Sequence, residues 1–129
     1  MSYTIKNLRE IKDYAVEFGL SETQEAHFAH PELEAEETGV SFHVVKPGRR
    51  QAFGHRHENA EEVYVVLGGS GRMRLDDEIV DIGPLDAVRV APKVARAFEG
   101  GPDGLEVLAF GARHDGDGET LNDFWPESD

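Results

Sequence analysis

The side chains best suited to chemistry are two histidines and a glutamate near the middle of the chain. His55 and His57 are separated by one residue, so on an extended backbone both imidazoles point to the same side. Glu62 precedes residues 63–67, a run of β-branched and aromatic residues that predicts a strand. Imidazole and carboxylate groups that converge from neighbouring strands can bind a first-row transition metal. We therefore predict a metal site formed by His55, His57 and Glu62.

The elements that must position these side chains are predicted from recurring short apolar runs. Such runs come about every eight to twelve residues, with glycine or proline between them. They lie near residues 40–46, 63–67, 72–75, 79–82, 86–92 and 105–110. The glycine-rich segments 68–69 and 100–104 are predicted as turns. This spacing is typical of an all-β barrel or sandwich.

Helical spacing occurs at the N-terminus, where apolar residues recur every three or four positions. The pattern predicts a short helix at about residues 7–18 that ends at Gly19. We interpret His27 and His30 as surface or pocket-rim histidines, because they lack a carboxylate or a third histidine at ligand spacing. His43 is interpreted as a hydrogen-bonded strand histidine.

Composition restricts the classes of function. The chain has 129 residues, which corresponds to one domain with a sizeable core. A formal net charge of −13 argues against binding nucleic acid or an anionic membrane through bulk electrostatics. Without cysteine, disulfides and thiolate metal sites are excluded. No apolar run has the length of a membrane span and the N-terminus lacks a signal-peptide pattern, so we expect a cytoplasmic protein.

The spacing around the histidine pair resembles the first motif of the cupin superfamily. That motif consists of His-x-His, a gap of three or four residues, Glu, six residues and Gly. Here His55 and His57 are followed by a four-residue gap, Glu62, six residues and Gly69. An alternative register uses Glu61 and Gly68. We prefer Glu62, because Tyr64 and Val66 then share its face of the strand.

The resemblance to small single-domain cupins implies a double-stranded β-helix, or jelly roll. The barrel would cover residues 38–112. Residues 1–37 would form a lead-in that contains the short helix and packs on the barrel or a partner. Residues 113–129 would form a polar C-terminal tail. The tail holds Phe124 and Trp125, which we expect to pin the terminus onto the body or a partner chain. Its acidic stretch 115–119 is read as a solvated turn.

The second motif of the resembled family is altered in this sequence. It ends Pro-x-Gly-x-x-His and supplies a fourth metal ligand. The matching stretch is 92–97, where Val94 replaces glycine and the histidine position falls on Ala97 or, in a shorter loop, on Arg96. Arginine cannot ligate a metal, because it stays protonated and offers no lone pair. An inward Arg96 would instead add a fixed positive charge to the pocket.

Three functions are compatible with these residues. In the favoured one, His55, His57 and Glu62 bind Fe, Mn, Ni or Zn beside an unassigned small-molecule substrate, and the family resemblance implies an oxygenase or isomerase type of reaction. In the second, no metal binds, and Tyr64 and Arg96 line a polar pocket for an organic acid or sugar. In the third, the domain is a structural or interaction module. The resemblance also implies a homodimer, and the apolar faces of residues 63–67 need cover from the N-terminal segment or a second subunit.

Overall fold

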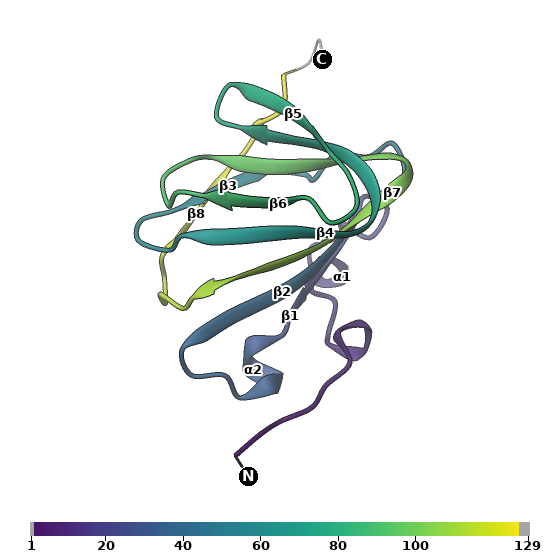
Figure 1. The fold of residues 1–129 in the computed structure, drawn as a ribbon. Coiled ribbons are helices and arrows are strands. Elements are labelled where there is room, and N and C mark those ends of the chain that lie inside the picture. The colour runs from purple at the N-terminus through teal and green to yellow at the C-terminus, as the bar shows by residue number, and fades with distance from the viewer. Residues whose placement is uncertain (1, 127–129) are drawn as a thin grey trace.

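Eight antiparallel strands curl around a common interior in the computed structural model, which describes residues 2–126 (Figure 1). The strands are β1 (Gln24–Phe28), β2 (Thr38–Val45), β3 (Gly54–His57), β4 (Glu62–Leu75), β5 (Glu78–Ile82), β6 (Ala87–Val90), β7 (Arg96–Ala112) and β8 (Gly118–Leu121). The helical elements are a 3₁₀ turn, η1 (Leu8–Glu10), and two single-turn helices, α1 (Tyr14–Glu17) and α2 (His30–Leu33). The all-β fold predicted from the sequence is therefore confirmed.

Two long strands, β4 and β7, hold the curled sheet together. They pair with each other along most of their length, and β7 also pairs with β2 and, through Arg96, with His55 of β3. β4 pairs in addition with β5 and β6. The path β1-β2-β7-β3-β8 completes the sheet. Strands β1 and β8 lie outside residues 38–112, so the sheet extends beyond the range that the resemblance implied for the barrel.

The glycine-rich segments 68–69 and 100–104 are not turns, and this prediction was wrong. β4 runs through Gly69 and β7 runs through Gly104, with register shifts between the two strands at Val66/Gly68 and Gly69/Gly71. At Gly69 the backbone has φ +70°, and a Cβ would lie 2.0 Å from the carbonyl oxygen of Gly104. Glycine is needed here because the two strands approach closely where the sheet bends.

The predicted helix at 7–18 is broken into two pieces, η1 and α1. Between them Ile11 and Asp13 are extended, because both bond to other segments. The carbonyl of Ile11 accepts from the His27 ring, and the Asp13 carboxylate accepts from the backbone N–H groups of Ala15 and Ala26. Asp13 thereby caps α1 and ties it to β1. Gly19 ends the segment with φ +69°, as predicted.

Alternation along β4 separates a buried face from a partly exposed one. Tyr64 and Val66 lie in the core with Val107 of β7, and burying each such side chain contributes about 1.5–3 kcal/mol. On the other face, Leu67 is 47% exposed. The N-terminal elements pack on β1 and β2. A second subunit over the apolar face that includes Leu67 remains our proposal.

The C-terminal segment is ordered against the body through 126, while 127–129 of the predicted tail lie outside the described residues. Of residues 115–119, predicted as a solvated turn, 115–116 form a turn, whereas Gly118 and Glu119 belong to β8, which pairs with β3. The guanidinium of Arg74 lies 4.4 Å from the Phe124 ring centroid, and that of Arg50 lies 4.7 Å from the Trp125 ring. These cation–π contacts confirm that the two aromatic residues pin the segment onto the body.

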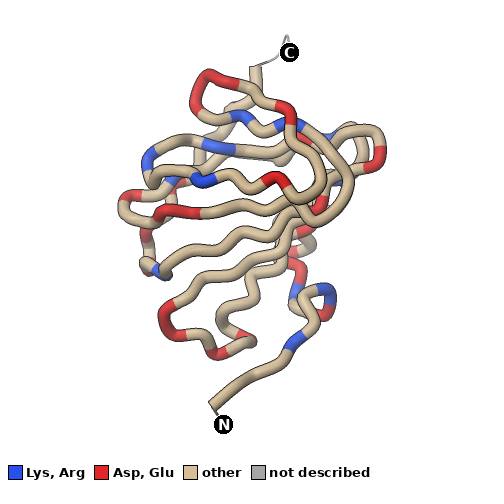
Figure 2. The backbone as a smooth tube through the Cα atoms, in the orientation of Figure 1, with Lys and Arg blue, Asp and Glu red and all other residues tan. Residues whose placement is uncertain are grey.

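Acidic positions are spread over loops on several sides of the barrel, as Figure 2 shows. This distribution fits the expectation of a solvated acidic surface. No helix within residues 2–126 is long and apolar enough to cross a membrane.

Candidate metal centre

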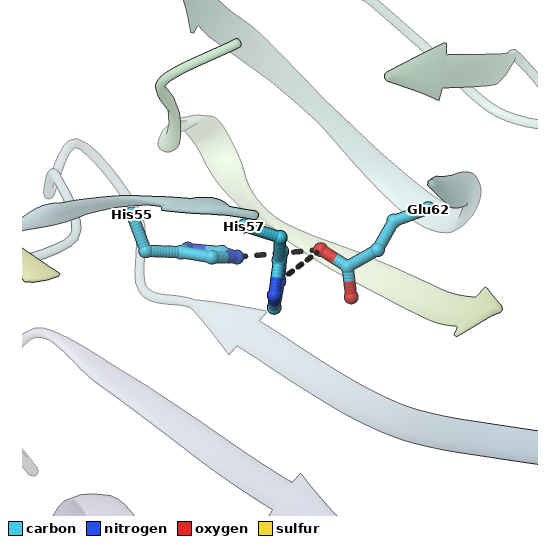
Figure 3. A group of neighbouring side chains, drawn as sticks. All are labelled: His55, His57 and Glu62. Atoms are coloured by element: carbon cyan, nitrogen blue, oxygen red, sulfur yellow. Dashed lines mark hydrogen bonds and ion pairs between the residues drawn. The ribbon is translucent and has the colours of Figure 1, made fainter. Parts of the chain in front are cut away.

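The three predicted ligands meet at one point near an end of the barrel. His55 and His57 lie on β3, and because β3 is extended both rings point to the same side. Their Nε2 atoms are 3.3 Å and 3.1 Å from the same carboxylate oxygen, Oε1 of Glu62, on β4, a strand that does not pair with β3 (Figure 3). One ligand atom of each residue lies within 4.8 Å of the other two.

The two adjacent glutamates differ in the direction of their side chains. Glu62 faces the histidines, whereas the Glu61 carboxylate is exposed and lies 3.2 Å from Nη1 of Arg89. Glu61 and Arg89 thus form an exposed ion pair. Arg56 likewise pairs with Glu119 on β8, at 2.8 Å.

Glu62 is held as a carboxylate by four donors to a single oxygen. Besides the histidines, the hydroxyl of Tyr64 donates to Oε1 at 2.5 Å and Nη2 of Arg96 donates at 3.0 Å. Burial by itself raises the pKa of Glu62, but the hydrogen bonds from His55, His57 and Tyr64 outweigh it and hold the pKa well below its usual range. Burial and the Glu62 charge raise the pKa of Tyr64, so the phenol keeps its proton.

Arg96 is one of the two residues on which the fourth-ligand position of the resembled family can fall, the other being Ala97. The side chain is fully buried and points inward. Its Nε donates to the Tyr64 hydroxyl at 3.0 Å, and Nη1 donates to the carbonyl groups of Pro92 and Val94 at 3.0 Å and 2.6 Å. Arg96 therefore lies behind Tyr64 and Glu62 rather than on a cavity wall, and its donors are directed at protein atoms.

Asp117 is a residue of this site that the sequence analysis missed. Its carboxylate oxygen Oδ2 lies 3.5 Å from Nδ1 of His57, on the side of the ring away from Glu62. Burial alone would raise the pKa of Asp117, but hydrogen bonds from Ala60 and Asn59 lower it, so the group is ionised. In the sequence, Asp117 is marked only by its position between two glycines, a pattern that predicts a turn. The pairing of β8 with β3 brings it to the histidine.

The other histidines have separate surroundings. His27 is buried, and its ring contacts the Ile11 carbonyl and the carboxylate of Glu25, so carboxylates are near it after all. His43 bonds to Ser41 at 2.8 Å, as expected for a strand histidine, and burial lowers its pKa to about 4. Burial lowers the pKa of His30, and the nearby positive charge of Arg113 lowers it further.

Besides a cavity of about 330 Å³ that reaches His57 but not Glu62 and is lined mostly by charged side chains, two cavities meet at the centre. One, of about 290 Å³, lies between the N-terminal segment and the inner face of the sheet, and His55, His57, Glu62 and Tyr64 are on its wall. The other, of about 190 Å³, reaches His57 and Glu62 from the side of Arg113. Small molecules can thus approach the centre, which satisfies a requirement for catalysis or ligand binding.

Comparison with known proteins supports the fold. No protein-family model matches this sequence. One curated relative, an uncharacterized protein from Methanocaldococcus jannaschii, is 36% identical over 45 residues, a stretch that spans 35% of this chain and 36% of that protein. The matched stretch is thus about a third of either length.

Solved structures match over nearly the whole chain. A cupin protein from Bacteroides fragilis is 21% identical, with 98% of each chain covered and a TM-score of 0.70. The polyketide cyclase RemF from Streptomyces resistomycificus is 19% identical, covering 96% of this chain and 87% of its own, with a TM-score of 0.73. An oxalate decarboxylase is 18% identical; the match covers 99% of this chain and 36% of that chain, with a TM-score of 0.77.

These similarities define the class of protein. The chain has the cupin fold, an all-β double-stranded β-helix, as the motif resemblance implied. Within that fold, His55, His57 and Glu62 form a group of side chains that could hold a metal ion.

Proposed function

We propose that this protein binds one divalent transition metal through His55, His57 and Glu62 and acts on a small molecule bound beside it. The observation that carries the proposal is the convergence of three donor atoms within 4.8 Å, from two strands, at the wall of a cavity. Two imidazoles and one carboxylate suit Fe, Mn, Ni or Zn. When bound at such a centre, the ion would serve as a Lewis acid or activate a bound water.

The environment of His57 supports this proposal. Its Nδ1 atom is buried and has no hydrogen-bond partner among the described residues, although Asp117 Oδ2 lies 3.5 Å away. If Nε2 offers its lone pair to a metal, Nδ1 carries the proton and faces that carboxylate. Carboxylates in this position orient ligating histidines and make them more basic. Asp117 would then be a positioning residue for the centre.

The protein residues leave room for chemistry. Neither Ala97 nor Arg96 can ligate a metal, so among the described residues three side chains surround the centre and other positions stay open for water or substrate. Tyr64 holds a proton at its hydroxyl, which lies 2.5 Å from Glu62 Oε1 and 3.4 Å from His55 Nε2. Two proteins of similar fold are named as enzymes, a polyketide cyclase and an oxalate decarboxylase, which supports a catalytic role.

Arg96 also supports a second candidate function, a metal-free binding protein. Its guanidinium pairs with Glu62 at 3.0 Å and offsets the cost of burying that carboxylate. A metal is therefore not the only group that can compensate the charge of Glu62.

Elemental analysis of the purified protein separates the two functions. We expect about one transition-metal ion per chain, either as purified or after incubation with Fe(II), Mn(II), Ni(II) or Zn(II) and removal of excess ion. A protein that retains only trace metal after all four incubations would support the metal-free function instead.

A further inference from the structure

The cavity of about 290 Å³ beside the N-terminal segment is walled mainly by aromatic and aliphatic side chains. Three of the seven phenylalanines and two of the three tyrosines of the chain line it. They are Tyr14, Phe18, Phe28, Phe53 and Tyr64. Aromatic walls favour a ligand with a flat apolar surface, through area burial and ring packing. A volume of about 290 Å³ is near the lower end of small-molecule sites and suits a compact ring system.

Charge is almost excluded from this cavity. The chain has 26 acidic and 13 basic residues, yet among the described residues Glu62 is the only one of them on the cavity wall. Its charge is paired with Arg96 from behind. A charged group on the ligand would lose hydration here without a protein partner, which is strongly unfavourable.

The uncharged polar groups on the wall are largely occupied. The side-chain oxygen of Gln24 accepts from the N–H of Ala52, and that of Gln51 accepts from the N–H of Phe98. The Ser41 hydroxyl is bonded to His43. The polar groups that cluster together on the wall are His55, His57 and Glu62, and His43 Nδ1 is a further buried atom there without a hydrogen-bond partner among the described residues.

Aromatic surface is also left open to solvent at the cavity. Phe18 is 71% exposed and Phe28 is 41% exposed. Both side chains line the cavity, so a ligand that fills it would remove part of this surface from water.

We propose that the ligand of this cavity is an aromatic small molecule whose ring system carries no charge and whose one polar group meets His55, His57 and Glu62. The part of the inference that concerns the reacting group rests on the proposed metal function. The preference for an uncharged aromatic body depends only on the cavity wall. Sugar phosphates and small organic acids are disfavoured, in contrast to the acid or sugar expected from the sequence for the metal-free alternative.

Two matched probes test the charge preference on the full chain. Binding of 2-naphthol and of 2-naphthoate is measured by isothermal titration calorimetry at pH 7, on metal-loaded and chelator-treated protein. We expect 2-naphthol to bind both forms. On chelator-treated protein, 2-naphthoate should bind at least tenfold more weakly, and glucose 6-phosphate should show no binding. Absence of 2-naphthol binding, or equal affinity for the two probes on chelator-treated protein, would overturn the inference.

Two exposed phenylalanines give matched variants. Phe53 lines the cavity and Phe110 of β7 does not, and each is 36% exposed, so neither replacement should prevent folding. Phe53→Ala should weaken 2-naphthol binding by about tenfold, whereas Phe110→Ala should leave it unchanged. Equal effects of the two replacements would place the probe elsewhere and contradict the inference.

The outcomes separate this inference from the proposed function. Binding of 2-naphthol to a protein that retains no metal would preserve the inference and reject the metal function. Stoichiometric metal without 2-naphthol binding would preserve the metal function and reject the inference.

Discussion

Two groups of histidine and carboxylate side chains lie within the described residues, and they use the same residue types differently. His55, His57 and Glu62 form one, and Asp13, Glu25 and His27 form the other. In each group the ligand atoms lie within 4.8 Å of one another. Only the first group opens onto both cavities at the centre, through His57 and Glu62.

In the second group each side chain already has a structural partner. Asp13 accepts hydrogen bonds from the backbone of Ala15 and Ala26. The two ring nitrogens of His27 lie 2.7 Å from the Ile11 carbonyl oxygen and 2.9 Å from a Glu25 carboxylate oxygen. Both partners are acceptors, so the doubly protonated imidazolium satisfies both contacts. We infer that this group fastens the N-terminal segment to β1.

The source of positive charge distinguishes the two groups. At the candidate metal centre, Arg96 provides a positive charge 3.0 Å from Glu62. In the second group, the contacts of His27 with two acceptors favour the charged imidazolium opposite Glu25. A protonated imidazole has no lone pair for a metal. We infer that His27 is unavailable as a ligand while it carries this charge.

Removing Arg96 should have the largest effect, because it takes away the cation beside Glu62. We expect Arg96→Met to lower the free energy of unfolding by about 3–5 kcal/mol, since Glu62 would be left buried without its ion-pair partner. Arg89→Met is the matched control, because its pair with Glu61 is exposed and should contribute less than about 1 kcal/mol. Urea denaturation of chelator-treated protein measures both values. Similar losses for the two variants would contradict this account.

Replacing a histidine of each group tests which group holds the metal. His55→Ala or His57→Ala should lower metal affinity by at least about 100-fold, because a ligand is lost. His27→Ala should lower stability but leave metal stoichiometry unchanged. Metal content after equilibrium dialysis is the readout. Loss of metal in His27→Ala with retention in His57→Ala would reverse the assignment.

Asp117 should have a smaller effect, through His57. Asp117→Asn keeps an oxygen that can accept from Asn59 and Ala60 but removes the negative charge facing Nδ1, so metal affinity should fall by about 10-fold or more. Asp115→Asn is the control, because Asp115 is exposed and pairs with Arg113. Competition titration against a chelator measures the change. An equal affinity for the two variants would remove Asp117 from the site.

The His27 group should give a pH-dependent stability of about 1 kcal/mol. Burial lowers the pKa of His27, but the bonds to Glu25 and Ile11 outweigh it and raise the pKa above its ordinary value of 6.5. The folded protein therefore binds the proton more tightly than the unfolded chain. The stabilisation is present in full below about pH 6.5 and is lost as the pH rises through the folded-state pKa.

The variant His27→Gln isolates the pH-dependent contribution of His27 to stability. The difference in free energy of unfolding between the native protein and His27→Gln should shrink as pH rises from 6 to 9, in urea denaturation at each pH. A difference that stays constant over this range would show that His27 is not charged in the folded state.

Much of the fold and centre was predictable because it depends on local patterns. Period-two spacing placed His55 and His57 on one side of a strand, and Tyr64 and Val66 on the face that Glu62 shares. The glycine-rich segments misled the prediction, because glycine serves close strand approach at Gly69 as well as turns. The helix at 7–18 was wrong because bonds to β1 outweighed local helix preference, which is a weak term in a short segment.

By itself, the sequence determined which chemistry is available: two imidazoles and a carboxylate at strand spacing, an alanine or arginine at the position of a fourth ligand, and an acidic composition without cysteine. Only the tertiary structure decided that Arg96 turns inward to pair with Glu62, that Asp117 reaches His57, and that the described acidic and basic residues other than Glu62 stay off the cavity wall. The physical reason is distance along the chain. Periodicity fixes the direction of neighbouring side chains, whereas contacts between residues 57 and 117 or 62 and 96 depend on strand pairing, which no local pattern encodes.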